Sequence, residues 1–385
     1  FNANNLPYGY FLPKNKDLKK TRPIVSYATH PMRHMLQRAS RGLSLLLKSP
    51  AIKDLHFTLH RTDEFAQSIL NAQKQCHDEG YNHAAVMAGD IKQMYTELPH
   101  SDIMEAVDWL ISQAAPNTRR KHISVPRRAR HGTHMGTNYN TKSFVTFTLD
   151  ELREIVRFDL DNAIFKVGDT ILKQNVGIPM GSPISPVLAI VVCAFYEAKL
   201  KASIKSNPTF NRNIHGARYV DDAILIVGYN TDTPGDEIIA NDMLQHVADN
   251  GYQKLTLECD PDRNHIKMLE SIVDTTDVGN ISLRFWHKNA ESINDHNTQK
   301  FIKYQHFDSF SPYNAKRGVL ISSLLRMRKA SSHHEGLQRA IPAFVKELRL
   351  LDYPLGIIRS AVNTVTHRSD NDPFWRGVVN LVYDA

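Results

Sequence analysis

The sequence predicts an α+β protein with more than one compact lobe. Its 385 residues exceed the size of one small module and allow a sizeable buried core. Short runs of strand-forming residues alternate with amphipathic segments as far as residue 286, which indicates mixed helices and strands. From residue 316 onward, the apolar residues recur at helical spacing only. We therefore expect a mixed body followed by a helical lobe.

The composition excludes several classes of protein. Hydrophobic residues make up 42% of the chain and charged residues 23%, which excludes a disordered chain. The three cysteines lie far apart without a CxxC pair, which excludes a disulfide scaffold or a Cys-rich zinc module and fits a reducing compartment. The longest apolar run, residues 187–196, is about half of a membrane span, so we expect no membrane partner.

Helices and strands can be assigned along the first half of the chain. We expect an extended stretch at 19–27, helices at 32–48, 62–79, 101–113 and 149–158, a strand at 84–88, and strands at 163–167 and 170–174. Gly168-Asp169 between the last two is a hairpin signal, and Ser101 is a candidate helix cap. Residues 117–143 hold few apolar residues and are predicted to be a loop or an insertion.

The second half begins with a loop rich in Gly, Pro and Ser at 177–186, which opens an apolar helix. Further expected elements are two strand arms at 217–219 and 223–227, a helix at 235–250, and strands at 254–258, 266–273 and 280–286.

Basic charge is concentrated at the two ends of the chain. Residues 1–50 carry nine Lys or Arg and one acid, and residues 301–385 carry twelve against seven. The pI is about 9.1. Two basic ends around a near-neutral middle suit a polyanion gripped from two sides, and solvated surface explains them equally well.

The most informative tetrapeptide is Tyr219-Val220-Asp221-Asp222, because its two acids fall between two strand arms. Adjacent carboxylates at a hairpin tip repel each other unless a cation neutralises them, although Asp-Asp can also be ordinary turn chemistry. Asp90 also follows an apolar strand, at 84–88. Oxygen ligands without Cys or His favour Mg²⁺ over zinc.

Three segments in order resemble palm motifs A, B and C of reverse transcriptases: residues 90–99 (DIKQMYTELP), 177–186 (GIPMGSPISP) and 219–222 (YVDD). Residues 12–16 (LPKNK) and 21–26 (TRPIVS) resemble the fingers motifs, and residues 251–255 (GYQKL) resemble motif D.

Within reverse transcriptases, the chain most resembles the Penelope-like retroelement family, which is related to telomerase. The forms of motifs A and B, Phe165 with residues 174–177, and the segment from Lys316 to Pro354 are similar to that family. Many Penelope-like proteins also carry a GIY-YIG endonuclease, for which we find no counterpart in this sequence. We expect either a trimmed chain or a branch without that domain, and the first residue, Phe1, suggests a start inside a longer protein.

The resemblance implies a right-hand polymerase. The expected parts are fingers at 1–85, palm with motif A at 86–100, fingers at 101–175 with a basic insertion at 117–143, palm with motifs B to E at 176–295, and a helical thumb at 296–385. The palm would hold an antiparallel sheet.

The resemblance also implies the catalytic residues. Asp90, Asp221 and Asp222 would hold two Mg²⁺ ions, for which Mn²⁺ could substitute, and the backbone at Ile91 would help. Lys254 would protonate the leaving pyrophosphate, with an exposed strand lysine as the alternative.

The incoming nucleotide would contact a second set of residues. Arg22 and either Lys14 or Lys16 would bind the triphosphate, and Tyr95 would exclude a 2′-hydroxyl unless it is simply a core tyrosine. Gly181 would allow close backbone approach beside Met180, where many reverse transcriptases have Gln.

The resemblance implies a third set of residues, which would contact the nucleic acid. For the arginines in this set, ordinary surface charge is the alternative. Its members are Ser182, Pro183, Tyr219, Arg119, Arg120, Arg127, Arg128, Arg317, Arg326 and Arg328.

We therefore expect an RNA-directed DNA polymerase that extends a DNA or RNA primer with dNTPs on an RNA template. An RNA-dependent RNA polymerase and a domesticated, non-catalytic nucleic-acid-binding protein are the alternatives. A nuclear location follows from the family resemblance alone.

Overall fold

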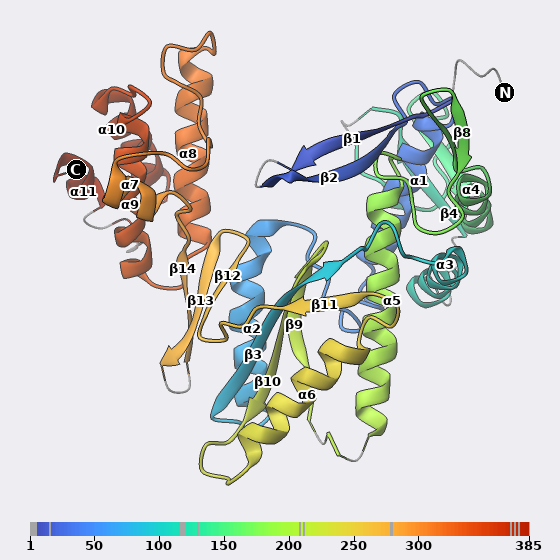
Figure 1. Ribbon diagram of the computed structural model, residues 1–385, viewed down its shortest axis with the longest axis horizontal. Helices are drawn as coiled ribbons and strands as arrows, with labels where there is room; N and C mark the ends of the chain where they lie inside the picture. The colour runs from blue at the N-terminus through green and yellow to red at the C-terminus, as the bar shows by residue number, and fades with distance from the viewer. Residues whose placement is uncertain are drawn as a thin grey trace. The chain divides into compact units, whose positions relative to one another are not determined.

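The computed structural model describes residues 6–14, 17–115, 121–128, 131–207, 209–210, 212–277, 280–369, 372, 375 and 378–384. The chain forms two compact units. The first comprises Phe1–Thr58, Gly89–Asn213 and Gln245–Glu258, and the second comprises Leu59–Ala88, Ile214–Leu244 and Cys259–Ala385. Helices and strands occur in both, which confirms the α+β prediction (Figure 1).

The first unit contains a four-stranded sheet in the order β2-β1-β7-β8. Its strands are β1 (Tyr8–Lys14), β2 (Asp17–Ser26), β7 (Ile164–Val167) and β8 (Thr170–Lys173). β1 and β2 form an antiparallel hairpin that pairs Leu12 with Arg22. The predicted hairpin at Gly168-Asp169 is confirmed, because Val167 pairs with Thr170. The sequence does not predict β1, because its apolar residues are contiguous rather than alternating. Of these residues the strand buries only Gly9, and Tyr8, Tyr10, Phe11 and Leu12 are exposed.

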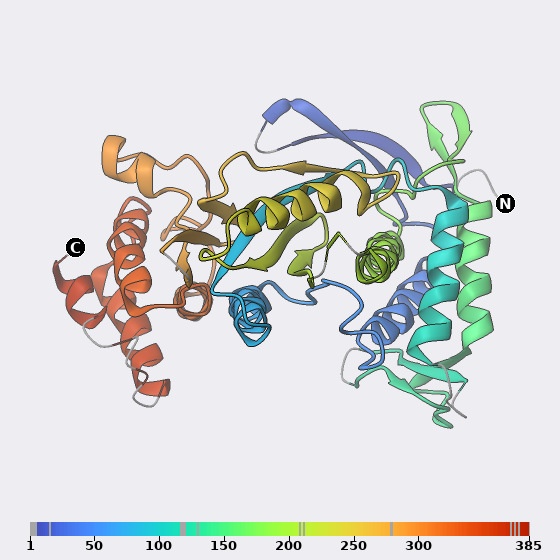
Figure 2. The same ribbon diagram turned by 90° about the horizontal axis from the view of Figure 1, so that it is seen from below.

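Four helices pack together in the first unit: α1 (Arg33–Leu47), α3 (His100–Ala114), α4 (Leu149–Asp161) and α5 (Ser185–Ser206). Figure 2 shows α3 and α4 side by side. α5 is apolar on nearly every side and is therefore largely buried. The predicted cap at Ser101 is wrong, because α3 begins one residue earlier and the Ser101 hydroxyl donates to Asp102.

Residues 117–143, predicted to be a loop or an insertion, contain two short strands in their described part. β4 (His122–Pro126), β5 (His134–Met135) and β6 (Phe144–Thr148) form a sheet in the order β5-β4-β6. Ile123 and Val125 are fully buried, and the Ser124 hydroxyl between them donates to the Gly136 carbonyl. The apolar alternation spans only these two residues, which is too short to stand out among the surrounding charges.

A second four-stranded sheet has the order β11-β3-β10-β9. Its strands are β3 (His83–Lys92), β9 (His215–Tyr219), β10 (Asp222–Tyr229) and β11 (Thr256–Cys259). β3 is longer than predicted, and the boundary between the units falls within it, after Ala88. In the second unit, α2 (Phe65–Asp78) follows a 3₁₀ turn (Thr62–Glu64) and covers β9 and β10. α6 (Asp236–Asn250) follows β10 along the chain.

The second unit also contains the sheet β12-β13-β14, with β12 at His265–Met268, β13 at Ser271–Asp277 and β14 at Asn280–Phe285. The prediction of one strand over 266–273 is therefore wrong. The chain turns at Leu269 and Glu270, where Leu269 adopts a φ of 54°, and Met268 pairs with Ser271. The turn contains neither Gly nor Pro, so the sequence does not mark it.

The predicted C-terminal helices are confirmed. They are α8 (Tyr313–Lys329), α9 (His334–Arg349), α10 (Leu355–Arg368) and α11 (Val378–Asp384), with the short α7 (Ala290–His296) before them. Leu320, Leu324, Ile341 and Phe344 belong to their common core. Across the described residues, no helix combines the length and apolarity needed to span a membrane.

Candidate active site

Asp90 lies near the end of β3, in the first unit, where the buried part of the strand gives way to a half-buried stretch. The Lys92 ammonium lies 2.6 Å from Asp90 Oδ2 and 2.6 Å from Glu258 Oε2. These hydrogen bonds, first the one to Asp90 and then the one to Glu258, raise the pKa of Lys92, and the bond from Lys92 lowers the pKa of Glu258. The Asp90 carboxylate therefore already attracts a cation. The Ile91 side chain is buried, so only its backbone could contact a ligand.

Asp221 and Asp222 lie at the tip of the β9–β10 hairpin, in the second unit. Tyr219 pairs with Asp222, which leaves Val220 and Asp221 as a two-residue turn. Val220 adopts a φ of 58°, a left-handed conformation that costs a β-branched residue roughly 1–2 kcal/mol. Asp221 is exposed and Asp222 is half-buried, so the tip presents both carboxylates beside a strained turn.

Arg218 supports this turn from inside the protein. Its side chain is fully buried, and Nη1 donates to the Val220 carbonyl at 2.9 Å. The sequence alone does not reveal Arg218, because a charged residue in a strand is usually taken to be on the surface.

The motif B loop (residues 177–186) is hydrogen-bonded to the motif A segment (90–99) and to the fingers segment 21–26, all within the first unit. The amide of Ile178 donates to the Tyr95 carbonyl at 2.7 Å, and the amide of Val25 at the end of β2 donates to the Met180 carbonyl at 2.8 Å. Gly181 has a φ of 133°, and a Cβ at this position would lie 2.2 Å from the Val25 carbonyl oxygen. Only glycine fits this close approach.

A buried acid lies behind the same loop. The Ser182 hydroxyl donates to Asp159 Oδ2 at 3.3 Å, and both residues are buried together with Tyr27. Burial raises the pKa of Asp159 from 3.8 to about 7. Burial also raises the pKa of Tyr27, and the charge of Asp159 adds to this increase. Ser182 is predicted to contact nucleic acid, but its hydroxyl is turned to Asp159 inside the protein. Pro183 beside it is half-buried.

The predicted triphosphate contacts lie on the β1–β2 hairpin. Arg22 is exposed on β2, and Lys14 ends β1, where it pairs with Asp17. Lys16 lies outside the described residues. Arg22 lies three residues before Val25 on β2, and the amide of Val25 is hydrogen-bonded to the motif B loop.

Lys254 lies in a turn rather than on the predicted strand, because β11 begins at Thr256. The turn is anchored by Tyr252, whose hydroxyl donates to the buried Glu197 at 3.0 Å. Gln253 adopts a φ of 51°, and Lys254 is exposed. The lysine is thus an exposed side chain on an anchored turn.

The predicted arginine contacts fall into two groups. Arg127 donates through Nε to the Thr141 carbonyl at 3.0 Å, and Arg128 is exposed, whereas Arg119 and Arg120 lie outside the described residues. In the second unit, the three predicted thumb arginines have intramolecular acceptors. Arg317 donates to Ser360 at 2.9 Å, Arg326 to Glu270 at 2.8 Å and Arg328 to Asp372 at 2.9 Å.

Tyr219, also predicted to contact nucleic acid, is partly buried and packs against the hydrophobic core around α2.

No protein-family model and no curated protein matches the sequence. Solved structures do resemble the fold. The chain is similar to a telomerase from Candida albicans solved in complex with a TWJ fragment of telomeric RNA, with a TM-score of 0.59, 13% identity, and coverage of 98% of this chain and 62% of that one. It is also similar to an apo telomerase from Candida tropicalis, with a TM-score of 0.52, 13% identity, and coverage of 98% and 61%. The chain thus spans about three fifths of these telomerase chains. The fold is that of a right-hand polymerase.

Proposed function

We propose that the chain is an RNA-directed DNA polymerase of the Penelope-like retroelement kind, which extends a primer 3′-hydroxyl with dNTPs on an RNA template. The observation that carries the proposal is the acidic tip of the β9–β10 hairpin, held by the buried Arg218. The similar Candida albicans telomerase, solved with a fragment of telomeric RNA, supports an RNA template. The predicted fingers, palm and thumb boundaries and a nuclear location belong to the same proposal.

The proposal requires Asp90 to act together with Asp221 and Asp222. Each acid is supported by its own local position. Asp90 lies near the end of β3, Asp222 begins β10, and Asp221 occupies the turn before it.

The donor atoms suit Mg²⁺, with Mn²⁺ as a substitute. Carboxylate oxygens from Asp90, Asp221 and Asp222 and the Ile91 carbonyl form an all-oxygen set without Cys or His. The ammonium of Lys92 lies 2.6 Å from Asp90, which supports a cation-binding role for this carboxylate. When bound, two ions supply activation of the 3′-hydroxyl and neutralisation of the pyrophosphate leaving group.

The remaining residues bind and orient the substrates. Arg22 and either Lys14 or Lys16 hold the triphosphate. Arg22 suits this role because its planar guanidinium can make paired contacts with phosphate oxygens. Tyr95 limits the space beside the sugar, so a 2′-hydroxyl is disfavoured. Gly181 admits the template–nucleotide pair against the backbone. Lys254 gives a proton to the departing pyrophosphate.

Primer extension on an RNA template tests the proposal, with dNTPs or NTPs and with Mg²⁺ or EDTA. Asp221→Asn should abolish detectable extension, because positioned charge supplies most of the rate. Asp169→Asn is the matched control, since it makes the same change in the exposed turn between β7 and β8 and should extend normally. Normal extension by Asp221→Asn would refute the assignment.

The same assay separates the two alternatives. Extension with NTPs alone would indicate an RNA-dependent RNA polymerase. Tight nucleic-acid binding without extension under any condition would indicate a non-catalytic binding protein that keeps the polymerase fold.

A further inference from the structure

A cavity of about 770 Å³ lies within the second unit, between one face of the β12-β13-β14 sheet and helices α7 and α9. Alternation along the strands creates this face. Ile266 and Met268 point into the core around α2, whereas Lys267 between them lines the cavity. The volume falls in the range of ligand-binding pockets, roughly 300–1,000 Å³.

The lining of the cavity is strongly basic. Five lysines and arginines line it against two acids, Glu291 and Asp295. Arg339 on α9 is exposed and makes no hydrogen bond or ion pair with the described residues. A concave surface with this excess of positive charge concentrates anions.

An aromatic ring lies among these cations. Trp286 follows β14, and the ammonium groups of Lys267 and Lys288 lie 5.7 Å and 5.1 Å from its ring centroid. The ring is half-buried, so part of it is open to a ligand. Lysines around a tryptophan combine phosphate binding with a surface on which a nucleobase can stack.

The walls of the cavity are fixed by close packing. At Gly336 on α9, an added Cβ would lie 2.9 Å from Arg284 Cβ, so α9 touches β14 at this point. The amide of Ser332 donates to the Leu283 carbonyl at 2.8 Å, and the Ser332 hydroxyl accepts from the Leu283 amide at 2.8 Å. The helix and the sheet are therefore joined directly, and the cavity is formed before a ligand arrives.

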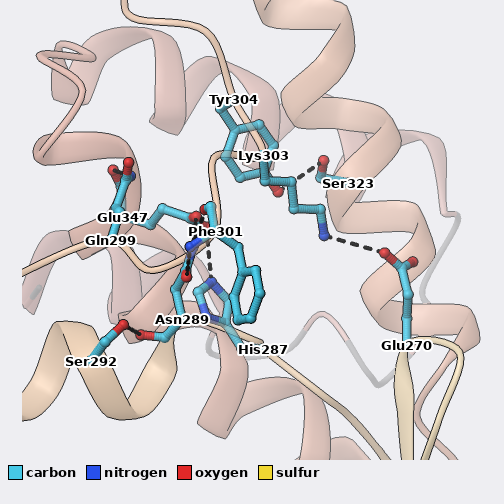
Figure 3. Close-up of polar contacts among 10 residues, drawn as sticks. All are labelled: Glu270, His287, Asn289, Ser292, Gln299, Phe301, Lys303, Tyr304, Ser323 and Glu347. Carbon is cyan, nitrogen blue, oxygen red and sulfur yellow. Dashed lines mark hydrogen bonds and ion pairs between the residues drawn. The ribbon is translucent and has the colours of Figure 1, made fainter. Parts of the chain in front are cut away.

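One buried polar atom in the lining has no partner among the described residues. His287 lines the cavity with only 7% of its side chain exposed, and its Nδ1 is buried without a hydrogen bond. Its Nε2 lies 3.1 Å from Oε2 of the buried Glu347. Figure 3 draws the two side chains facing each other. Asn289 and Gln299 hold Glu347 in turn. The buried Nδ1 needs a hydrogen-bonding partner, such as water, that the described residues do not supply.

We propose that this cavity binds one nucleotide unit of a single-stranded nucleic acid. Arg284 and Arg339 take the phosphate, and Trp286 stacks on the base. Basic charge with one open aromatic ring suits an unpaired strand, because the bases of a duplex are already stacked. The site lies wholly in the second unit and does not depend on polymerase activity.

Binding of fluorescein-labelled 12-nucleotide oligouridylate and oligothymidylate in EDTA tests the proposal, because extension cannot occur there. Trp286→Leu should weaken binding about tenfold through lost stacking. Arg339→Gln, on an exposed helix surface, should retain the fold. It should reduce the slope of log affinity against log salt concentration by about one, the value for one phosphate contact. Lys74→Gln on α2 is the charge-matched control and should bind like the wild type. The two probes show whether RNA or DNA is preferred.

Photocrosslinking with 4-thiouridine in the same oligomer locates the strand, and the crosslink should fall within residues 285–301. Crosslinks found only elsewhere, or wild-type binding by both Trp286→Leu and Arg339→Gln, would overturn the proposal. Equal displacement by polyglutamate would also overturn it, because any polyanion would then suffice. Because binding is measured in EDTA, failure of the proposed polymerase activity would not be mistaken for failure of this site.

Discussion

Arg218 donates from Nη1 to the carbonyl of Val220 at 2.9 Å, which links a fully buried guanidinium to the strained turn that presents Asp221 and Asp222. A left-handed conformation at a β-branched residue persists only where the surroundings fix it. The hydrogen bond from Arg218 is one contact that can fix it.

Removing this donor should impair the reaction more than substrate binding. In Arg218→Met, the partly buried Val220 carbonyl loses its charged donor, which costs roughly 1–3 kcal/mol. We expect kcat for single-nucleotide extension to fall about tenfold or more, with a much smaller change in KM for dNTP. Arg61→Met, in an exposed ion pair, is the control. Equal changes in kcat and KM, or none, would contradict a positioning role.

Gly181 should tolerate no side chain. Gly181→Ala places Cβ 2.2 Å from the Val25 carbonyl at a φ of 133°, so β2 and the motif B loop must separate. We expect the free energy of unfolding to fall by roughly 2–4 kcal/mol and extension to fall about a hundredfold. Denaturant titration and primer extension measure the two effects.

The control for this change is Gly318→Ala on α8. No atom lies within 4 Å of the added Cβ there, and alanine is the better helix former. This variant should gain about 0.5–1 kcal/mol of stability. A Gly181→Ala protein as stable and active as Gly318→Ala would show that the close approach of Gly181 to Val25 is unimportant.

The sequence reveals residues whose chemistry is local and misses those whose role depends on distant partners. The acidic hairpin tip is predictable because two strand arms flank it. Asp159 escapes prediction although it occupies a core position of α4, on the stripe that includes Val156 and Leu160, where an acid is unexpected. The Lys92–Glu258 ion pair joins segments far apart in sequence, and no local pattern marks it.

Asp159 should make stability depend on pH. The folded state keeps its proton up to about pH 7, whereas an ordinary aspartate loses it near 3.8. Between these values the folded state binds more protons than the unfolded chain, so each unit of rising pH removes up to about 1.4 kcal/mol from the free energy of unfolding. Asp159→Asn should therefore gain about 2–3 kcal/mol relative to the wild type from pH 5 to pH 7.

Urea titrations at pH 5, 6, 7 and 8 measure this difference. Asp161→Asn, an exposed position at the end of the same helix, should follow the wild type at every pH. A constant difference between Asp159→Asn and the wild type across the series would mean that Asp159 titrates normally.

Lys92 should compete with Mg²⁺ for Asp90. Both side chains are partly exposed, and exposed ion pairs contribute about 0.2–1 kcal/mol, so the competition is modest. Lys92→Met should lower the Mg²⁺ concentration for half-maximal extension about two- to fivefold. Lys166→Met, which breaks the exposed pair with Asp169, is the control. A higher Mg²⁺ requirement in Lys92→Met would instead assign Lys92 to substrate binding.

Tyr95 should decide between deoxynucleotides and ribonucleotides. Its carbonyl fixes the motif B loop through Ile178, and this backbone contact survives a side-chain change. Its ring is half-buried, so Tyr95→Ala opens space beside the sugar without cutting into a fully buried core. We expect the ratio of kcat/KM for dNTP to kcat/KM for NTP to fall at least tenfold, because kcat/KM for NTP rises. Tyr139→Ala, at an exposed tyrosine, should leave the ratio unchanged. An unchanged ratio in Tyr95→Ala, with a lower melting temperature, would make Tyr95 a packing residue and reopen the RNA polymerase alternative.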